Sequence, residues 1–200
     1  MKVGLYGYGY VGRAVEQFVL AVAETVTVYD IAIDPDWEPL TACDVVFVCV
    51  PTPLVDGQLD TTAVAEALSR MAPVSLVILK STIPPDFAQS LPPNTVYQPE
   101  FVGESRYHIP EHRYFDPREM RKNPWHLFGG KREAVVRAME LYQRIVGPTV
   151  DLIPTSAVAA SLTKLMSNAF AALKISWSNE MYDLCQAYGT NWVEVRQLWS

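Results

Sequence analysis

Residues 2–12 read KVGLYGYGYVG, and this stretch decides the fold. Its first residues form a short apolar run, which predicts a buried strand. Apolar residues at helical spacing then predict a helix over Tyr10–Ala23. Between the two, Gly7, Gly9 and Gly12 fit the pattern G-x-G-x-x-G, placed after a strand and at the start of a helix. The stretch therefore predicts a dinucleotide-binding turn.

Each glycine has a predicted role in such a turn. Gly7 permits the tight turn, Gly9 lets the backbone approach a pyrophosphate, and Gly12 lets helix and strand pack closely. The free N–H groups at the helix N-terminus, at Tyr10 and Val11, would face the phosphate oxygens. A tight turn that binds no ligand is the alternative interpretation.

A second strand, predicted over Val26–Asp30, ends in an acid. Asp30 lies eighteen residues after Gly12. A carboxylate at this place accepts hydrogen bonds from both ribose hydroxyls and repels a 2′-phosphate. We therefore predict NAD, and not NADP, as the cofactor.

Strands alternate with helices along most of the chain. Apolar patterns predict further strands at residues 44–50, 75–80, 94–97, 125–130 and 149–153, and helices at 60–71 and 131–145. This alternation predicts an α/β fold, a Rossmann-like doubly wound parallel sheet. The strand signals cease near Pro154, so we divide the chain into an NAD-binding domain at 1–153 and a helical segment at 154–200.

Composition excludes several classes of protein. The 200 residues allow one large domain with a short appendage. A net charge of -6 without a basic run argues against nucleic acid and anionic membranes as partners. The apolar runs are too short to span a bilayer, and three cysteines in apolar surroundings favour a reducing compartment. We expect a soluble, cytoplasmic protein.

Proline and hydroxyl residues follow two of the predicted strands. Pro51 and Thr52 come after the strand at 44–50, and Ser81 and Thr82 after the strand at 75–80. Carboxyl ends of parallel strands form the edge where open α/β sheets bind ligands, so we expect these side chains at the cofactor. A simple strand terminator and a helix cap are the alternative interpretations.

Five motifs make the sequence resemble the UDP-glucose/GDP-mannose dehydrogenase family, NAD-dependent enzymes that oxidise the C6 alcohol of a sugar nucleotide to a carboxylate. The motifs are Gly7–Gly12, Val50–Pro53, Lys80–Pro84, Pro99–Phe101 with Glu104, and Lys164–Asn168 followed by residues 175–180. They occur in order along nearly the whole chain.

The resemblance implies roles for individual residues. Thr82 would lie near nicotinamide and substrate and hold a water, and Glu100 would serve the reaction centre. Lys164 would stabilise developing oxyanion charge, and Asn168 would orient water and substrate. Residue type alone, without the resemblance, favours a solvated loop acid at Glu100 and a lysine that reaches out to solvent at Lys164. The predicted cofactor contacts are Gly7, Tyr10, Val11, Gly12, Asp30, Pro51, Thr52, Ser81, Thr82 and Glu104.

The chain also departs from the family. The family's second oxidation uses a cysteine thiolate in a glycine-rich segment downstream of the Lys/Asn helix, followed by a nucleotide-sugar domain. The sequence ends at Ser200, before any such segment, so we expect a truncated protein. Cys43, Cys49 and Cys185 stand in apolar surroundings and are interpreted as small buried hydrophobic residues.

Two connecting segments differ in length from those of the family. The stretch between Asp30 and Asp44 is short, which predicts that one helix and an edge strand are lost or reduced. The loop at 103–123 is long and polar, and we interpret it as a surface loop that is solvated or contacts an anion or a partner. The histidines and arginines assigned to it are His108, His112, His126, Arg106, Arg113, Arg118 and Arg121. Their spacing matches no metal-binding signature, so no metal is predicted.

Three functions follow from these observations. The first is an NAD-dependent oxidoreductase that makes a single hydride transfer from a sugar-nucleotide-like alcohol. The second is a non-catalytic NAD(H)-binding module, or one that a partner completes. The third is an expressed fragment of a full-length dehydrogenase. In each case the resemblance implies a homodimer formed through the apolar helix predicted at 155–188.

Overall fold

The computed structural model describes residues 1–101 and 120–199. It consists of two compact units, Met1–Leu162 and Thr163–Ser200. The first unit is an α/β layer structure, and the second is helical. Each unit is described by itself.

The first unit is built on one seven-stranded sheet with the strand order β2-β1-β3-β6-β7-β8-β9. The strands are β1 (Lys2–Tyr6), β2 (Thr25–Tyr29), β3 (Val45–Val48), β6 (Val77–Leu79), β7 (Thr95–Tyr97), β8 (Trp125–Gly130) and β9 (Asp151–Thr155). The five strands from β2 to β7 are parallel, as the sequence predicts. In contrast, β8 is antiparallel to β7 and parallel to β9, so the sheet is mixed. Apolar patterning predicts a strand but not its direction, because the direction depends on the end of the sheet at which the preceding connection finishes.

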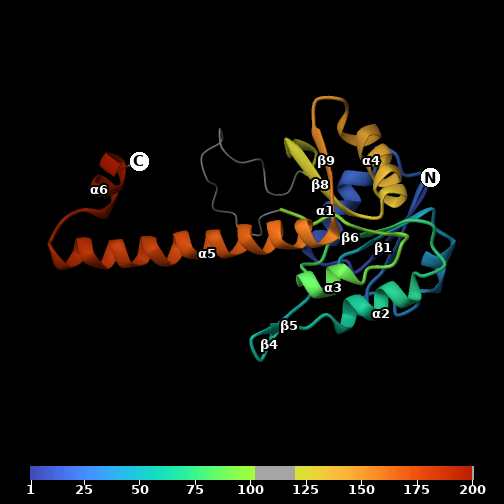
Figure 1. Ribbon diagram of the computed structural model, residues 1–200, viewed down its shortest axis with the longest axis horizontal. Helices are drawn as coiled ribbons and strands as arrows, with labels where there is room; N and C mark the ends of the chain where they lie inside the picture. Colours follow the sequence, from blue (N-terminus) through green and yellow to red (C-terminus); the bar gives the residue numbers. More distant parts are fainter. Residues whose placement is uncertain (102–119, 200) are drawn as a thin grey trace. The chain divides into compact units, whose positions relative to one another are not determined.

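Helices cover both faces of this sheet, which confirms the doubly wound arrangement (Figure 1). They are α1 (Tyr10–Val19), α2 (Thr62–Arg70), α3 (Pro85–Gln89) and α4 (Arg132–Val146), with short 3₁₀ helices η1 (Glu38–Ala42) and η2 (Met120–Lys122). Alternate residues of β3 point to opposite faces. Val45 and Phe47 pack in the core under α1 and α4, and Val46 and Val48 in the core under α2 and α3.

The first helix is shorter than predicted. It ends at Val19, because the N–H groups of Val22 and Ala23 both donate to the Val19 carbonyl and close the helix with a tighter turn. Its N-terminus, at Tyr10, is as predicted. The end that faces the glycine turn is therefore the end that the sequence places correctly.

The stretch between Asp30 and Asp44 is reduced, as the sequence predicts. It contains only η1 and an isolated bridge between Asp30 and Asp34. As a result β2 is the edge strand of the sheet.

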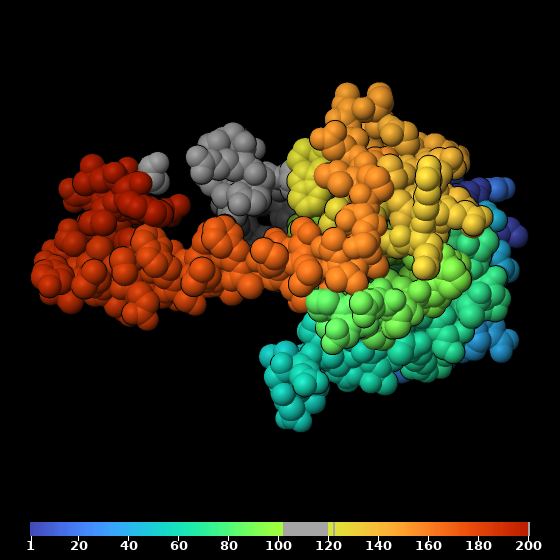
Figure 2. Space-filling view, viewed as in Figure 1, coloured from blue at the N-terminus to red at the C-terminus, as the bar shows by residue number. Residues whose placement is uncertain are grey.

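A small hairpin follows Pro53 and was not predicted. Its strands are β4 (Leu54–Val55) and β5 (Gln58–Leu59), which form a separate two-stranded sheet. Asp56 and Gly57 form the turn, with φ of 49° and 79°. An Asp-Gly pair tolerates these positive φ values, which a two-residue hairpin turn requires. The hairpin projects from the first unit (Figure 2).

The long helix α5 (Ala157–Ala187) has 31 residues. Its residues up to 162 belong to the first unit, where the Ser161 hydroxyl donates to the Ile83 carbonyl at 2.7 Å. In the second unit, α6 (Trp192–Trp199) packs on α5 through Trp177, whose ring lies 4.8 Å from that of Trp199. Our domain division after residue 153 stays a prediction. Among the described helices, none is both long and apolar enough to cross a membrane.

Candidate dinucleotide site

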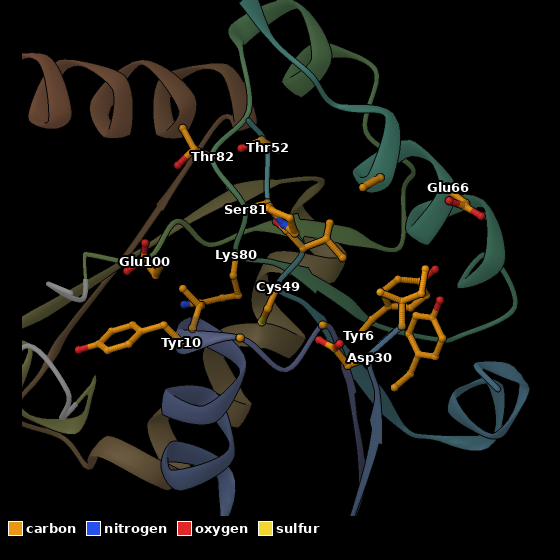
Figure 3. Close-up of a pocket in the computed structure, with 18 residues that line it drawn as sticks. Tyr6, Tyr10, Asp30, Cys49, Thr52, Glu66, Lys80, Ser81, Thr82 and Glu100 are labelled. Carbon is orange, nitrogen blue, oxygen red and sulfur yellow. The ribbon is translucent and has the colours of Figure 1, made fainter. Parts of the chain in front are cut away.

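A cavity of about 640 Å³ lies at the carboxyl ends of β1, β2, β3 and β6 (Figure 3). This is the edge at which the sequence places the ligand. The lining residues are Tyr6, Gly7, Gly9, Tyr10, Val11, Tyr29, Asp30, Ile31, Cys49, Val50, Pro51, Thr52, Ala63, Glu66, Lys80, Ser81, Thr82 and Glu100. Most of the predicted cofactor contacts are among them.

The glycine turn has the geometry of a phosphate cradle. Gly7 has a backbone φ of +95°, which residues other than glycine rarely adopt. A Cβ on Gly12 would lie 2.2 Å from the Gly7 carbonyl oxygen, so Gly12 allows α1 to approach the turn itself. A Cβ on Gly9 would meet no atom within 4 Å, so the space beside this backbone is open. Gly12 contacts the turn and does not line the cavity.

The acid at the end of β2 is held by backbone donors. The N–H of Tyr8 donates to Asp30 Oδ2 at 2.7 Å, and the N–H of Ala32 donates to Oδ1 at 2.9 Å. Each carboxylate oxygen has a second lone pair, so Asp30 is oriented by the protein and can still accept from a ribose diol.

The same side of the cavity has a wall that we did not predict. Tyr6 and Tyr29 pack with ring centroids 4.5 Å apart. Arg70 donates to both phenol oxygens, at 2.8 and 3.3 Å, and pairs with Glu66 at 2.5 Å. Burial is the main reason why the pKa of Tyr6 rises to about 12. Ala63 and Glu66 both line the cavity from α2. They are three residues apart, so they lie on the same side of the helix, and this spacing is the sequence signal for the side of α2 that faces the cavity.

The other side of the cavity brings together the residues that follow β3, β6 and β7. The Ser81 hydroxyl donates to the Val50 carbonyl at 2.6 Å and so ties the two strand ends together. Thr52, Thr82 and Glu100 line this part of the cavity (Figure 3). The structure therefore unites polar groups that are about fifty residues apart in sequence.

Lys80 lies at the end of β6 and was not predicted as a site residue. Its side chain is only 1% exposed, although it lines the cavity. Its ammonium donates to Gln98 Oε1, which also accepts from the Tyr142 hydroxyl at 2.6 Å.

Cys49 corrects one interpretation. We placed it inside a strand, but β3 ends at Val48 and Cys49 lines the cavity. Burial raises the pKa of its thiol to about 12 and also raises the pKa of Cys43. Cys43 and Cys185 are buried, as expected. For Cys49, burial outweighs the nearby positive charge of Lys80, which by itself would lower the pKa of the thiol, so the thiol is not activated for nucleophilic chemistry.

The remaining predicted residues lie elsewhere. Lys164 and Asn168 belong to the second unit, so the structure does not test whether they join the cavity. Glu104 lies outside the described residues, as do His108, His112 and the arginines at 106, 113 and 118.

His126 is not part of the long loop. It lies in β8 and is 2% exposed, because its ring packs against Phe18 and Tyr142 in the core. Burial lowers its pKa to about 3. In the described parts of the chain, no group of three potential metal ligands occurs.

These features fit a dinucleotide. The open space beside Gly9 and the N-terminus of α1 suit a pyrophosphate, and Asp30 suits a ribose diol. Comparisons with known proteins agree. The model of the NAD binding domain of the UDP-glucose/GDP-mannose dehydrogenase family matches residues 33–109, and that of the family's central domain matches residues 158–200. The chain belongs to the UDP-glucose/GDP-mannose dehydrogenase family. NAD is the cofactor of its nucleotide-binding domain.

Over the aligned part, curated members of the family are about three tenths identical to this chain. UDP-N-acetyl-D-mannosamine dehydrogenase of Pyrococcus horikoshii is 31% identical in an alignment of 172 residues that covers 80% of this chain and 40% of the relative. UDP-glucose 6-dehydrogenase of Rickettsia typhi is 29% identical in an alignment of 168 residues that covers 77% of this chain and 37% of the relative. The chain thus spans well under half the length of these two relatives.

Solved structures show the same fold. A GDP-mannose dehydrogenase from Pseudomonas aeruginosa matches with a TM-score of 0.81 at 17% identity, covering 99% of this chain and 56% of that one. A UDP-D-ManNAc dehydrogenase from Pyrococcus horikoshii matches with a TM-score of 0.79 at 22% identity, covering 99% and 57%.

Proposed function

We propose that this member of the UDP-glucose/GDP-mannose dehydrogenase family takes part in the NAD-dependent oxidation of a CH–OH group of a sugar nucleotide in the cytoplasm. The observation that carries the proposal is the cavity in which the open glycine turn, Asp30, Thr82 and Glu100 meet. The relatives' names supply the class of substrate: UDP-glucose, UDP-N-acetyl-D-mannosamine and GDP-mannose.

The binding roles follow from the geometry. The backbone beside Gly9 and the first N–H groups of α1 would hold the pyrophosphate. Asp30 would hold the ribose, and Thr52 and Ser81 would contact the cofactor from the ends of β3 and β6. When bound, NAD supplies the hydride acceptor.

The reaction we propose is a single hydride transfer. The alcohol loses a hydride from carbon and a proton from oxygen, which yields a carbonyl compound, NADH and a proton. Glu100 would take the proton, directly or through a water held by the Thr82 hydroxyl. Lys164 would stabilise the developing alkoxide, and Asn168, one helical turn along, would orient the substrate.

A second oxidation to the carboxylate requires a thiolate nucleophile. Cys49 lines the cavity, but its pKa of about 12 leaves it almost wholly protonated at neutral pH. A binding module completed by another polypeptide is the second candidate function. It needs only the cofactor contacts that the cavity supplies, Gly9 and Asp30 among them.

Two measurements test the proposal. Calorimetric titration with NAD and NADP establishes binding, and absence of NAD binding would refute both candidates. The NADH absorbance band is then followed with each of the three sugar nucleotides. Turnover that survives replacement of all three cysteines but not Lys164→Ala supports the oxidoreductase. Binding of NAD without turnover of any of the three favours the module.

We further propose that the chain forms a homodimer through α5. This helix exposes Met166, Phe170, Leu173 and Ile175, each at least 60% exposed. Such an apolar surface is costly in water and is typical of a protein interface. Light scattering should give twice the mass of the chain, and the double variant Phe170→Glu with Leu173→Glu should give a monomer. A monomeric wild-type chain at micromolar concentration would contradict this.

A further inference from the structure

Glu66 is the one acid of α2, and its carboxylate is oriented by Arg70. The Arg70 guanidinium, one helical turn further on, pairs with Glu66 Oε1 at 2.5 Å. Arg70 is itself fixed, because it donates to the hydroxyl groups of Tyr6 and Tyr29 and lies 5.1 Å from the centre of the Trp37 ring. The carboxylate of Glu66 keeps Oε2 and a second lone pair on Oε1, so it can accept further hydrogen bonds.

The order of the strands shows which half of the cofactor lies near Glu66. Under the proposed function, Asp30 at the end of β2 holds the adenosine ribose, and the nicotinamide half extends the other way, over the ends of β3 and β6. Arg70 contacts Tyr29, the last residue of β2, so the pair of Glu66 and Arg70 lies on the adenosine side.

Two lining residues on this side suit a purine ring. Ile31 follows Asp30, lines the cavity and is 84% exposed, so it offers an apolar surface to the face of a bound ring. Glu66 lines the cavity from α2 (Figure 3) and offers an acceptor to the edge of that ring.

A carboxylate distinguishes adenine from other purines by the group at position 6. The 6-amino group of adenine donates hydrogen bonds, whereas the 6-oxo group of hypoxanthine or guanine only accepts them. An ionised carboxylate also only accepts, so it pairs with the amino group and leaves a 6-oxo group unpaired. The neighbouring N1–H of a 6-oxopurine reaches the same carboxylate only if the ring shifts.

We propose that Glu66 accepts a hydrogen bond from the 6-amino group of adenine and so selects dinucleotides that contain adenine over those that contain a 6-oxopurine. Arg70 is a positioning residue in this scheme, since it orients the carboxylate from the side of the two tyrosines. The inference rests on the proposed binding of NAD in this cavity and is independent of any turnover.

The test compares NAD with nicotinamide hypoxanthine dinucleotide, which differs only in having an oxygen in place of the 6-amino group. Calorimetry with the whole chain gives the two dissociation constants at fixed pH and ionic strength. The wild type should bind NAD about tenfold more tightly than the hypoxanthine analogue, as expected for one hydrogen bond to a charged acceptor.

Variants of Glu66 assign that preference. Glu66→Ala should bring the two dissociation constants within about twofold of each other, mainly by weakening NAD. Glu66→Gln should also lower the preference, because its amide can donate to the 6-oxo group. Glu133→Gln is the matched control: it removes the same charge from α4, which covers the other face of the sheet, and should keep the wild-type preference.

The outcomes separate this inference from cofactor binding itself. If the wild-type chain binds neither dinucleotide, the proposed function fails. If NAD binds but the wild type shows no preference, or if Glu66→Ala weakens both dinucleotides equally, only the role of Glu66 is refuted. Thermal unfolding shows whether Glu66→Ala folds, and Glu66→Gln decides in its place if it does not. Failure of both variants to fold would also refute the inference, since Glu66 would then be needed for folding.

Discussion

Gly9 and Gly12 offer the sharpest test of the cavity as a cofactor site, because the structure predicts opposite behaviour for the same substitution. A Cβ on Gly9 meets nothing within 4 Å, whereas a Cβ on Gly12 lies 2.2 Å from the backbone oxygen of Gly7. The first methyl group would occupy only the space reserved for ligand. The second would collide with the protein.

The expected stabilities follow from this contrast. Gly9 is the N-cap of α1, and alanine is a poorer cap by about 0.5–1 kcal/mol. Alanine also lowers the conformational entropy of the unfolded chain, which stabilises the folded state by about 0.4–1 kcal/mol. The two effects nearly cancel, so the free energy of unfolding of Gly9→Ala should change by less than about 0.5 kcal/mol. For Gly12→Ala, overpacking costs about 1–3 kcal/mol, and higher helix propensity offsets at most about 1 kcal/mol.

Urea denaturation and calorimetric titration with NAD measure the two effects separately. Gly9→Ala should unfold like the wild type but bind NAD at least about tenfold more weakly, because the methyl group keeps the pyrophosphate off the backbone. Gly12→Ala should lose both stability and affinity. Wild-type NAD affinity in a folded Gly9→Ala variant would show that the open space beside Gly9 does not receive the cofactor.

Three further predictions concern single side chains. Asp30→Asn should lower the preference for NAD over NADP by about tenfold in calorimetric titrations, since the carboxylate that repels a 2′-phosphate is gone; an unchanged preference would remove Asp30 as the selecting group. The pKa of His126 is about 3 in the folded chain and 6.5 in the unfolded chain. Protonation therefore favours the unfolded state as the pH falls below 6.5. The free energy of unfolding should be lower by about 2–3 kcal/mol at pH 4.5 for this reason, and His126→Phe should abolish the loss in urea denaturation. The same dependence of unfolding free energy on pH in both proteins would contradict this. Iodoacetamide at pH 8 should modify Cys49 about a thousandfold more slowly than a free cysteine, as followed by mass spectrometry; alkylation at the rate of a free thiol would refute its high pKa.

The elements that the sequence predicts well are those whose signal is local. The glycine turn and the continuous apolar run of β3 are each recognised within a few positions; the turn is found where expected, and β3 lies within the predicted range 44–50. The hairpin was missed although Asp56-Gly57 is a strong turn signal. Its strands have only two residues each, too few to show an alternating pattern. The reversed direction of β8 has no local signal at all.

The cavity wall shows the same limit at the level of single residues. Asp30, Thr52, Ser81 and Thr82 follow strands, and the parallel-sheet rule brings strand ends to one edge. Lys80 precedes the predicted pair by one position, but a lysine at the end of a strand usually reaches solvent. Its burial depends on Gln98 and Tyr142, which belong to other elements. The sequence around Lys80 therefore carries no signal for it.

The shortened stretch after Asp30 accounts for the cluster of Tyr6, Tyr29 and Arg70 that forms the cavity wall beside Asp30. A doubly wound sheet of the common order has a third strand beyond β2, which supports the residues that hold the ribose. Here β2 is the edge strand, and Arg70 from α2 ties Tyr6 and Tyr29 together while its guanidinium lies 5.1 Å from the ring of Trp37. This cluster fixes the end of β2 from the side of α2. The cluster holds Tyr29, the last residue of β2, and the Tyr8 and Ala32 N–H groups orient the carboxylate of Asp30, which follows it. The acid proposed to bind the ribose is therefore held in place although β2 is an edge strand.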